Sequence, residues 1–290
     1  MTPYNLLLAP FLDYGFMRRA LVACLALALG CGPTGVLLLL RRMSLMGDAL
    51  SHAVLPGAAL GFLVAGLSLP AMSLGGLLVG LLVALLAGLV SRVTPLREDA
   101  SFAAFYLTSL ALGVLLVSLK GSNVDLLQIL FGSVLAVDDA ALVLVAGVAT
   151  VSLLVLAAVY RPLVVECFDP VFLRSVGGGG GRYHLLFAVV VVLNLVAAFQ
   201  ALGTLMAVGL MMLPAAAARF WARSVWGMAL TASGVGLLAA YVGLLASYHA
   251  GLPSGPAIVL SASLAYGLSV LAGREGGLLH RLRRPRHLEA

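Results

Sequence analysis

Asp48 and His52 are the two residues of this sequence whose types and spacing best suit the chemistry of a metal ion. They are four positions apart, so on a helix their side chains would lie about 40° apart and point in the same direction. A carboxylate supplies negative charge and a neutral imidazole supplies a nitrogen lone pair, which together suit a borderline divalent cation. The same spacing also allows a structural hydrogen bond between the two, or a pair that helps the helix to begin.

The residues around this pair divide the expected helix into two faces. Ser44 and Ser51 fall on the same flank as the pair and make that face polar. Gly57 and Gly61 form a GxxxG pair on the opposite face, a spacing that lets two helices approach closely. We therefore expect one face to look into a pathway and the other into a bundle of helices.

His249 is a second candidate for handling ions. It lies in the segment 247–256, which is expected on the outer side of a membrane, where it would help ions to enter. An interfacial histidine without such a role is the favoured interpretation. His184, beside Tyr183, is interpreted as an interfacial anchor.

Acidic residues also flank a short apolar stretch, 126–137, which is expected to form a short helix at the outer face because it is too short to span a bilayer. Asp125 precedes it, and Asp138 and Asp139 follow it. These carboxylates would attract cations there, although helix capping and solvation are the favoured interpretation. The three cysteines, Cys24, Cys31 and Cys167, are interpreted as small apolar residues within helices.

The elements that must position these residues are helices in a membrane. Apolar residues make up 62% of the 290 residues and charged residues 10%, whereas soluble domains have roughly 25% charged residues. The net charge of +6 comes from basic residues in short loops and in the tail. That placement indicates membrane topology and contact with anionic lipid headgroups, and no nucleic-acid partner is expected.

The hydropathy pattern predicts an all-α polytopic membrane protein with eight or nine transmembrane helices. The whole chain, 1–290, is expected to be a single transmembrane domain with a short N-terminal segment, 1–15, and a basic cytoplasmic tail, 274–290. Gly177 to Gly181 are expected to form a flexible loop. The stretch 201–218, which contains Gly203 and Pro214, is expected to be short or broken. The candidate spans are 16–40, 49–67, 71–92, 101–119, 139–160, 184–199, 201–218, 226–247 and 256–272.

Arginines set the expected orientation. With the tail in the cytoplasm and nine alternating spans, the outer side holds only Arg18, Arg19 and Lys120 among the basic residues. An excess of arginine on the cytoplasmic side is typical of membrane proteins.

Sequence motifs for enzymatic chemistry are missing. The sequence contains no GxxxxGK[ST] phosphate-binding loop, no HExxH and no GxSxG. The chain is therefore not expected to be an enzyme, and any ATP hydrolysis must occur on a partner.

Four stretches of the sequence, in order and in register, resemble the zinc/manganese/iron-type ABC transporter permeases. The first is residues 41–53, RRMSLMGDALSHA, which carries Asp48 and His52. The others are Val124-Asp125-Leu126 with Leu130–Ser133, Gly203-Thr204-Leu205 leading to Leu213–Arg219, and Pro253–Pro256 with Ile258–Leu260.

This resemblance implies a subunit of an importer in the bacterial plasma membrane, with an architecture related to cobalamin and iron-siderophore importers. It implies a second copy of the chain, a cytoplasmic ATPase and an extracytoplasmic metal-binding protein as partners. The transported ion would be Zn²⁺, which is favoured, with Mn²⁺ or Fe²⁺ as alternatives, and the chain would hold no cofactor of its own. The segment that couples to the ATPase would contain Arg219, Phe220, Trp221 and Arg223.

Two other classes are less favoured. A secondary transporter without ATP usually places several ionisable residues at mid-membrane, whereas this sequence places one carboxylate there, Asp48. An intramembrane metalloprotease would need a zinc-binding motif of the HExxH kind, which the sequence lacks.

Overall fold

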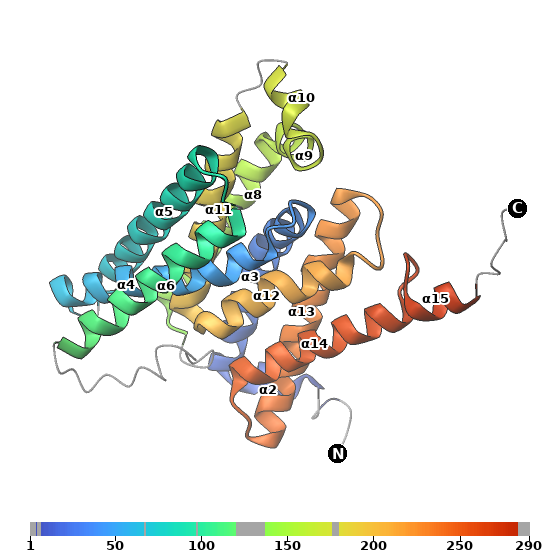
Figure 1. Cartoon of the computed structure of the whole chain (residues 1–290). Helices are drawn as coiled ribbons and strands as arrows, with labels where there is room; N and C mark the ends of the chain where they lie inside the picture. The colour runs from blue at the N-terminus through green and yellow to red at the C-terminus, as the bar shows by residue number, and fades with distance from the viewer. Residues whose placement is uncertain are drawn as a thin grey trace, which may run out of the picture.

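The structure, a computed structural model, describes residues 4, 7–66, 68–96, 98–119, 137–175 and 180–283. All regular secondary structure in these ranges is helical (Figure 1). The helices are α2 Ala9–Asp13, α3 Gly15–Leu40, α4 Ser44–Ala65, α5 Leu69–Val93, α6 Glu98–Leu119, α8 Asp139–Ala158, α9 Tyr160–Phe168, α10 Pro170–Ser175, α11 Gly180–Leu202, α12 Thr204–Ala218, α13 Val225–Ala250, α14 Ser254–Ala272 and α15 Leu278–Arg283.

Each candidate span falls on a helix, so the prediction of an all-α polytopic membrane protein is confirmed. Seven helices in the described ranges are long and apolar enough to cross a membrane. Two others are shorter, the apolar part of α6 over Ala100–Leu115 and α12 over Thr204–Ala218. Gly203, with φ of 87°, separates α11 from α12. A backbone of that kind favours glycine, and it confirms that 201–218 contains a short helix.

Helix α3 lies at the centre of the molecule. It packs on α13, α12, α8 and α11, and its side chains from Ala20 to Leu38 include many that are fully buried. Helices α4, α5 and α6 lie side by side to one side of it (Figure 1). The exposed surfaces of α5, α8 and α14 are apolar, as expected of helices that face lipid.

The GxxxG pair of α4 packs as predicted. A Cβ atom at Gly57 would collide with the backbone of Gly75, and one at Gly61 would collide with the backbone of Ala71. The backbones of α4 and α5 therefore touch at these positions, which fixes the rear face of α4.

Polar side chains within the bundle find partners on neighbouring helices. Asn194 of α11 donates from Nδ2 to Ser152 Oγ of α8 at 2.7 Å. Ser109 of α6 donates to the carbonyl oxygen of Ala53 on α4 at 3.2 Å. Such bonds stabilise helix pairs where no water is available.

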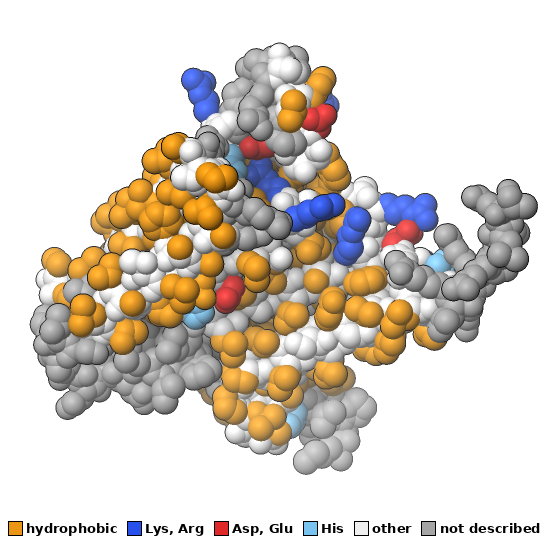
Figure 2. Space-filling view, in the orientation of Figure 1, with side chains coloured by type: hydrophobic (Ala, Val, Ile, Leu, Met, Phe, Trp, Pro, Cys, Tyr) orange, Lys and Arg blue, Asp and Glu red, His pale blue; other side chains and the backbone are white. Residues whose placement is uncertain are grey.

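The two ends of the bundle differ in charge. Arginine side chains gather along one end of the view, between α10 and α15 (Figure 2). The ends of α3, α9 and the start of α11 meet there, because Arg41 contacts Glu166 and His184. At the opposite end Arg19 pairs with Asp139 at 3.6 Å. Arg19 and Arg41 thus lie at opposite ends of α3, and the positive-inside rule assigns the arginine-rich end to the cytoplasm. The count of spans differs from the eight or nine predicted, since seven described helices are long and apolar enough to cross a membrane.

Several predicted boundaries were wrong. Helix α4 begins at Ser44 rather than at 49, because the polar residues Ser44 and Asp48 are part of the helix. The cytoplasmic segment after 158 contains two short helices, α9 and α10, that were not expected. Of the loop predicted at Gly177 to Gly181, residues 177–179 lie outside the described residues, and Gly180 and Gly181 belong to α11.

Acidic residues at the outer end cap and pair. Asp138 Oδ1 accepts a bond from the backbone N–H of Ala141 at 2.8 Å and caps α8. The capping interpretation is therefore confirmed for Asp138. Asp125 and the short helix predicted at 126–137 lie outside the described residues, except for the buried Val137.

Candidate metal pathway

Helix α4 starts from a tight junction with α3. The backbone N–H of Arg41 bonds to Leu37, and that of Met43 bonds to the carbonyl of Leu38 at 3.0 Å. Arg42 between them has a φ of 58°, a conformation that costs a non-glycine residue roughly 1–2 kcal/mol. The surroundings must hold this junction in place, and it sets where α4 begins.

Asp48 and His52 lie one and two turns into α4 and face the same way, as their spacing predicts. His52 Nε2 is 3.7 Å from Asp48 Oδ1, which is longer than a hydrogen bond. The side chain of Asp48 is 56% exposed and that of His52 is 31% exposed. The carboxylate and the imidazole are therefore close enough to bind one metal ion together, and they form no hydrogen bond with each other.

The imidazole of His52 packs beside an aromatic ring of α6. Its ring lies 6.0 Å from the ring of Tyr106 on α6, at an interplanar angle of 30°. Its Nδ1 is buried without a hydrogen-bond partner among the described residues. Ser51 does not offer its hydroxyl to the pair, since Oγ donates to the backbone carbonyl of Asp48 at 2.8 Å. The polar face is thus narrower than the sequence suggested.

The pair opens into a cavity of about 370 Å³. Helix α4 supplies its polar wall, while the start of α12 and one residue of α14 supply the rest. The residues that line it are Asp48, Ser51, His52, Thr204, Leu205, Val208, Gly209 and Val259. Two strong donors at the edge of an apolar cavity can pass a divalent cation along, but they cannot hold it tightly.

The described residues contain no group of three His, Cys, Asp or Glu side chains arranged to hold a metal ion. A carboxylate exposed to lipid would cost about 2.5–3.5 kcal/mol or more. The open side of Asp48 must therefore face water or another protein surface in the membrane.

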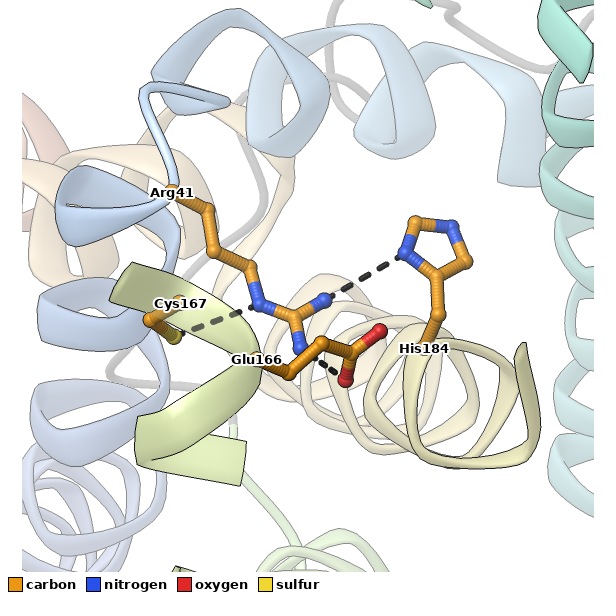
Figure 3. Close-up of polar contacts among 4 residues, drawn as sticks. All are labelled: Arg41, Glu166, Cys167 and His184. Carbon is orange, nitrogen blue, oxygen red and sulfur yellow. Dashed lines mark hydrogen bonds and ion pairs between the residues drawn. The ribbon is translucent and has the colours of Figure 1, made fainter. Parts of the chain in front are cut away.

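A second polar cluster lies at the arginine-rich end (Figure 3). Its central side chains are buried, whereas Asp48 and His52 are partly exposed. Arg41 Nη2 donates to Glu166 Oε2 at 2.7 Å, and the two side chains are 6% and 10% exposed. Arg41 Nε donates to Cys167 Sγ at 3.4 Å, and Nη1 lies 3.4 Å from His184 Nδ1. The guanidinium carbon also lies 4.4 Å from the ring centre of Phe187.

Sequence reasoning missed this cluster. It took Arg41 as a topology signal, Cys167 as a small apolar residue and His184 as an anchor. The one signal in the sequence was a carboxylate, Glu166, beside a cysteine in a basic cytoplasmic segment, and it does not name its partner. Burial raises the pKa of the Cys167 thiol, while Arg41 acts in the opposite direction.

The residues predicted to couple to the ATPase lie in the segment between α12 and α13, on the cytoplasmic end. Trp221 Nε1 donates to Ser269 Oγ of α14 at 2.8 Å. Arg223 Nε donates to Glu275 Oε2 at 2.6 Å, a contact that raises the pKa of the guanidinium. Arg219 and Phe220 line a surface hollow beside them. The C-terminal segment therefore holds this loop in a fixed shape.

His249 lies apart from Asp48 and His52. It is in the last turn of α13, which continues to Ala250, so the expected loop shrinks to three residues. Its ring packs edge-on against Tyr248, which in turn lies beside Tyr14. His249 is not among the residues that line the cavity.

Comparisons with known proteins cover nearly the whole chain. The model of the ABC 3 transport family matches residues 13–273. The manganese import system permease protein ScaB of Streptococcus parasanguinis is 36% identical over 257 residues, 89% of this chain and 90% of ScaB. The manganese transport system membrane protein MntC of Halalkalibacterium halodurans is 33% identical over 271 residues, 93% of this chain and 91% of MntC.

A solved structure shares the fold. The structure of PsaBC from Streptococcus pneumoniae in complex with Fab superposes with a TM-score of 0.84 and 32% identity. The match covers 96% of this chain and 100% of that one.

Proposed function

Because this chain belongs to the ABC 3 transport family, as the membrane-spanning subunit of a metal importer, we propose that the ion it carries is manganese. Support comes from the manganese import permease ScaB and the manganese transport protein MntC, each of which is similar to this chain over most of its length. The sequence analysis favoured zinc, and nothing in the comparisons supports that preference. The pair itself does not select the metal, since a carboxylate suits Mn²⁺ while imidazole suits Zn²⁺ and Fe²⁺.

We also propose that the ion passes Asp48 and His52, and the observation that carries this part of the proposal is that the pair is incomplete within one chain. Two donors facing an open cavity need further ligands, and a second copy of the chain would bring the same two residues from the opposite side. A twofold axis through the open side would also remove Asp48 from lipid. The resulting site would have few ligands, which suits an ion that must be released again.

We propose that two copies work by alternating access with two partners. ATP would be hydrolysed on a cytoplasmic ATPase, and an extracytoplasmic binding protein would deliver the ion. Membrane lipid surrounds the apolar faces of α5, α8 and α14.

Two cytoplasmic surfaces are candidates for contact with the ATPase. One is the predicted segment with Arg219, Phe220, Trp221 and Arg223, which is held rigid by Ser269 and Glu275. The other is the corner between α9 and α10, where large apolar side chains are exposed on an otherwise charged end: Phe168, Val171 and Phe172. Exposed apolar groups on a charged end favour a protein contact.

Uptake measurements test the proposal. Cells that make the chain with its ATPase and binding protein would be given radioactive Mn²⁺ or Zn²⁺ separately, with wild type compared against Asp48→Ala and His52→Ala. We expect each substitution to reduce Mn²⁺ uptake by about 10- to 100-fold or more, since loss of a direct ligand should cost no less than loss of an outer-shell partner. Membrane levels and assembly should stay normal because both residues are partly exposed.

His280→Ala is the matched control, since it removes an exposed histidine of α15 far from the cavity. Uptake of Zn²⁺ with no uptake of Mn²⁺ by wild type would overturn the choice of metal. Undiminished Mn²⁺ uptake in both α4 variants would show that the ion passes elsewhere.

A further inference from the structure

The cluster of Arg41, Glu166, Cys167 and His184, here called the Arg41 cluster, lies beside the start of α4. It is therefore placed to affect the position of that helix. Arg41 directly follows the last residue of α3, Leu40, and α4 starts three residues after Arg41, at Ser44. At a rise of 1.5 Å per residue, Asp48 is about 6 Å from that start and His52 about 12 Å. A shift of the junction would therefore move both donors together.

Backbone contacts link the cluster to the first turn of α4. Met43 donates to Leu38 in α3, and Met46 donates to Met43, both at 3.0 Å. Arg42 has a left-handed backbone, so the junction cannot bend freely. The far half of α4 touches the backbone of α5 at Gly57 and Gly61. The near half is buried on one side, at Met46 and Leu50, and exposed on the side of Asp48. The junction is therefore one of the contacts that set the position of the near half.

The contacts of Arg41 reach the cytoplasmic helices. Glu166 and Cys167 lie on α9, and His184 lies on α11 (Figure 3). Arg41 Nη1 lies 3.4 Å from His184 Nδ1. One side chain thus ties the α3–α4 junction to two other elements with directed bonds.

A buried ion pair is weak evidence for stability, because desolvation offsets much of the attraction. Directed, fully paired contacts instead fix one arrangement of the elements that they join. We propose that Arg41 is a positioning residue for transport: it holds the start of α4 against α9, so that a movement of α9 at the cytoplasmic face moves Asp48 and His52. This inference rests on the proposed function of that pair.

The test uses the complete importer, with its ATPase and metal-loaded binding protein, in liposomes. Glu166→Gln keeps the shape of the side chain and removes its charge, and Arg41→Lys keeps a charge but loses the planar set of donors. The measured quantity is Mn²⁺ transported per ATP hydrolysed. We expect Glu166→Gln to lower this ratio about tenfold, within the range of typical coupling between sites, while ATP hydrolysis stays near the wild-type rate.

Cys167 reports directly on the cluster. N-ethylmaleimide should alkylate it faster in Glu166→Gln, because its neighbour Arg41 is loosened, while Cys24 and Cys31 are fully buried in α3. The matched control is Arg19→Gln, which breaks an exposed ion pair at the opposite end. That control should change neither the ratio nor the alkylation.

Two results would overturn the inference. One is a wild-type transport ratio in Glu166→Gln although Cys167 is alkylated faster. The other is a joint fall of transport, hydrolysis and assembled complex in both Glu166→Gln and Arg41→Lys, which would mean that the cluster only stabilises the fold. If Glu166→Gln alone fails to assemble, the ratio is measured in Arg41→Lys, where a wild-type ratio takes the place of the first result. Failure of wild type to transport Mn²⁺ would instead contradict the proposed function.

Discussion

The two polar clusters of this protein use similar side chains in opposite ways. Asp48 and His52 stand 3.7 Å apart on one helix, partly exposed, at the edge of a cavity. Arg41, Glu166, Cys167 and His184 come from three helices, and their central ion pair is almost completely buried.

The difference separates two tasks. An unsaturated pair can accept and release an ion, because its ligand set is incomplete within one chain. The guanidinium of Arg41 instead contacts three side chains from two other helices, through Nε, Nη1 and Nη2, and such directed contacts are suited to hold elements in register. Charged residues and histidines of the same types therefore indicate a function only when their exposure and their partners are known.

The largest expected effect is a difference in stability between the two clusters. Glu166→Ala leaves Arg41 buried without its counter-charge, which should lower the free energy of unfolding by about 3–5 kcal/mol. Asp48→Ala removes a half-exposed, unsatisfied carboxylate and should change it by less than about 0.5 kcal/mol. The thermal midpoint of the purified protein in detergent measures both.

An equal fall of the thermal midpoint in the two variants would contradict this expectation, because Asp48 would then contribute as much to stability as Glu166. An unchanged midpoint in Glu166→Ala would show that the buried pair is not retained in solution.

The next effect concerns the rear face of α4, which holds the open pair in place. Gly57→Ala adds a methyl group where α4 touches the backbone of Gly75, and overpacking of this kind costs about 1–3 kcal/mol. Gly147→Ala in α8 is the control, since a Cβ there meets no atom within 4 Å. It should be neutral or stabilise the helix by up to about 1 kcal/mol.

Thermal midpoints of the two glycine variants, with Mn²⁺ uptake in parallel, check this expectation. Equal midpoints would contradict the close contact between α4 and α5.

A smaller effect is expected from the aromatic ring under Arg41. Phe187→Leu keeps an apolar side chain but removes the cation–π contact, which is worth about 0.5–2 kcal/mol. Phe168→Leu, at an exposed ring of α9, is the control for the general loss of an aromatic side chain. A drop in midpoint shared equally by both would show that the ring contributes only apolar area.

The smallest effect is a pH dependence at Cys167. Burial raises the pKa of this thiol, so it stays protonated to higher pH than an ordinary cysteine with a pKa of about 8.5. Because the thiolate is the reactive form, its alkylation should keep increasing at pH values where an ordinary thiol has levelled off. Leu45→Cys, at an exposed site of α4, supplies the ordinary thiol. Coinciding pH profiles would contradict the expectation.

Local spacing explains what the sequence could predict. Asp48 and His52 are one helical turn apart, and Gly57 and Gly61 share a face, so a helix alone places each pair. Hydropathy placed the helices because each spanning segment has to be apolar along its own length.

Long separations explain what it could not. Glu166 and His184 lie 125 and 143 residues from Arg41, and only the packing of α3, α9 and α11 brings them together. The helices α9 and α10 were missed because they are short and not apolar enough to stand out. The roles of Arg219, Phe220, Trp221, Arg223 and His249 stay predictions.

The central claim is that the open pair of two copies forms the transit site for Mn²⁺. The most direct measurement is an experimental structure of the assembled importer soaked with Mn²⁺, with the metal located by its anomalous signal. We predict a metal peak between the two copies, within coordination distance of Asp48 and His52 of each. A peak that contacts neither residue, in an importer that transports Mn²⁺, would contradict the account.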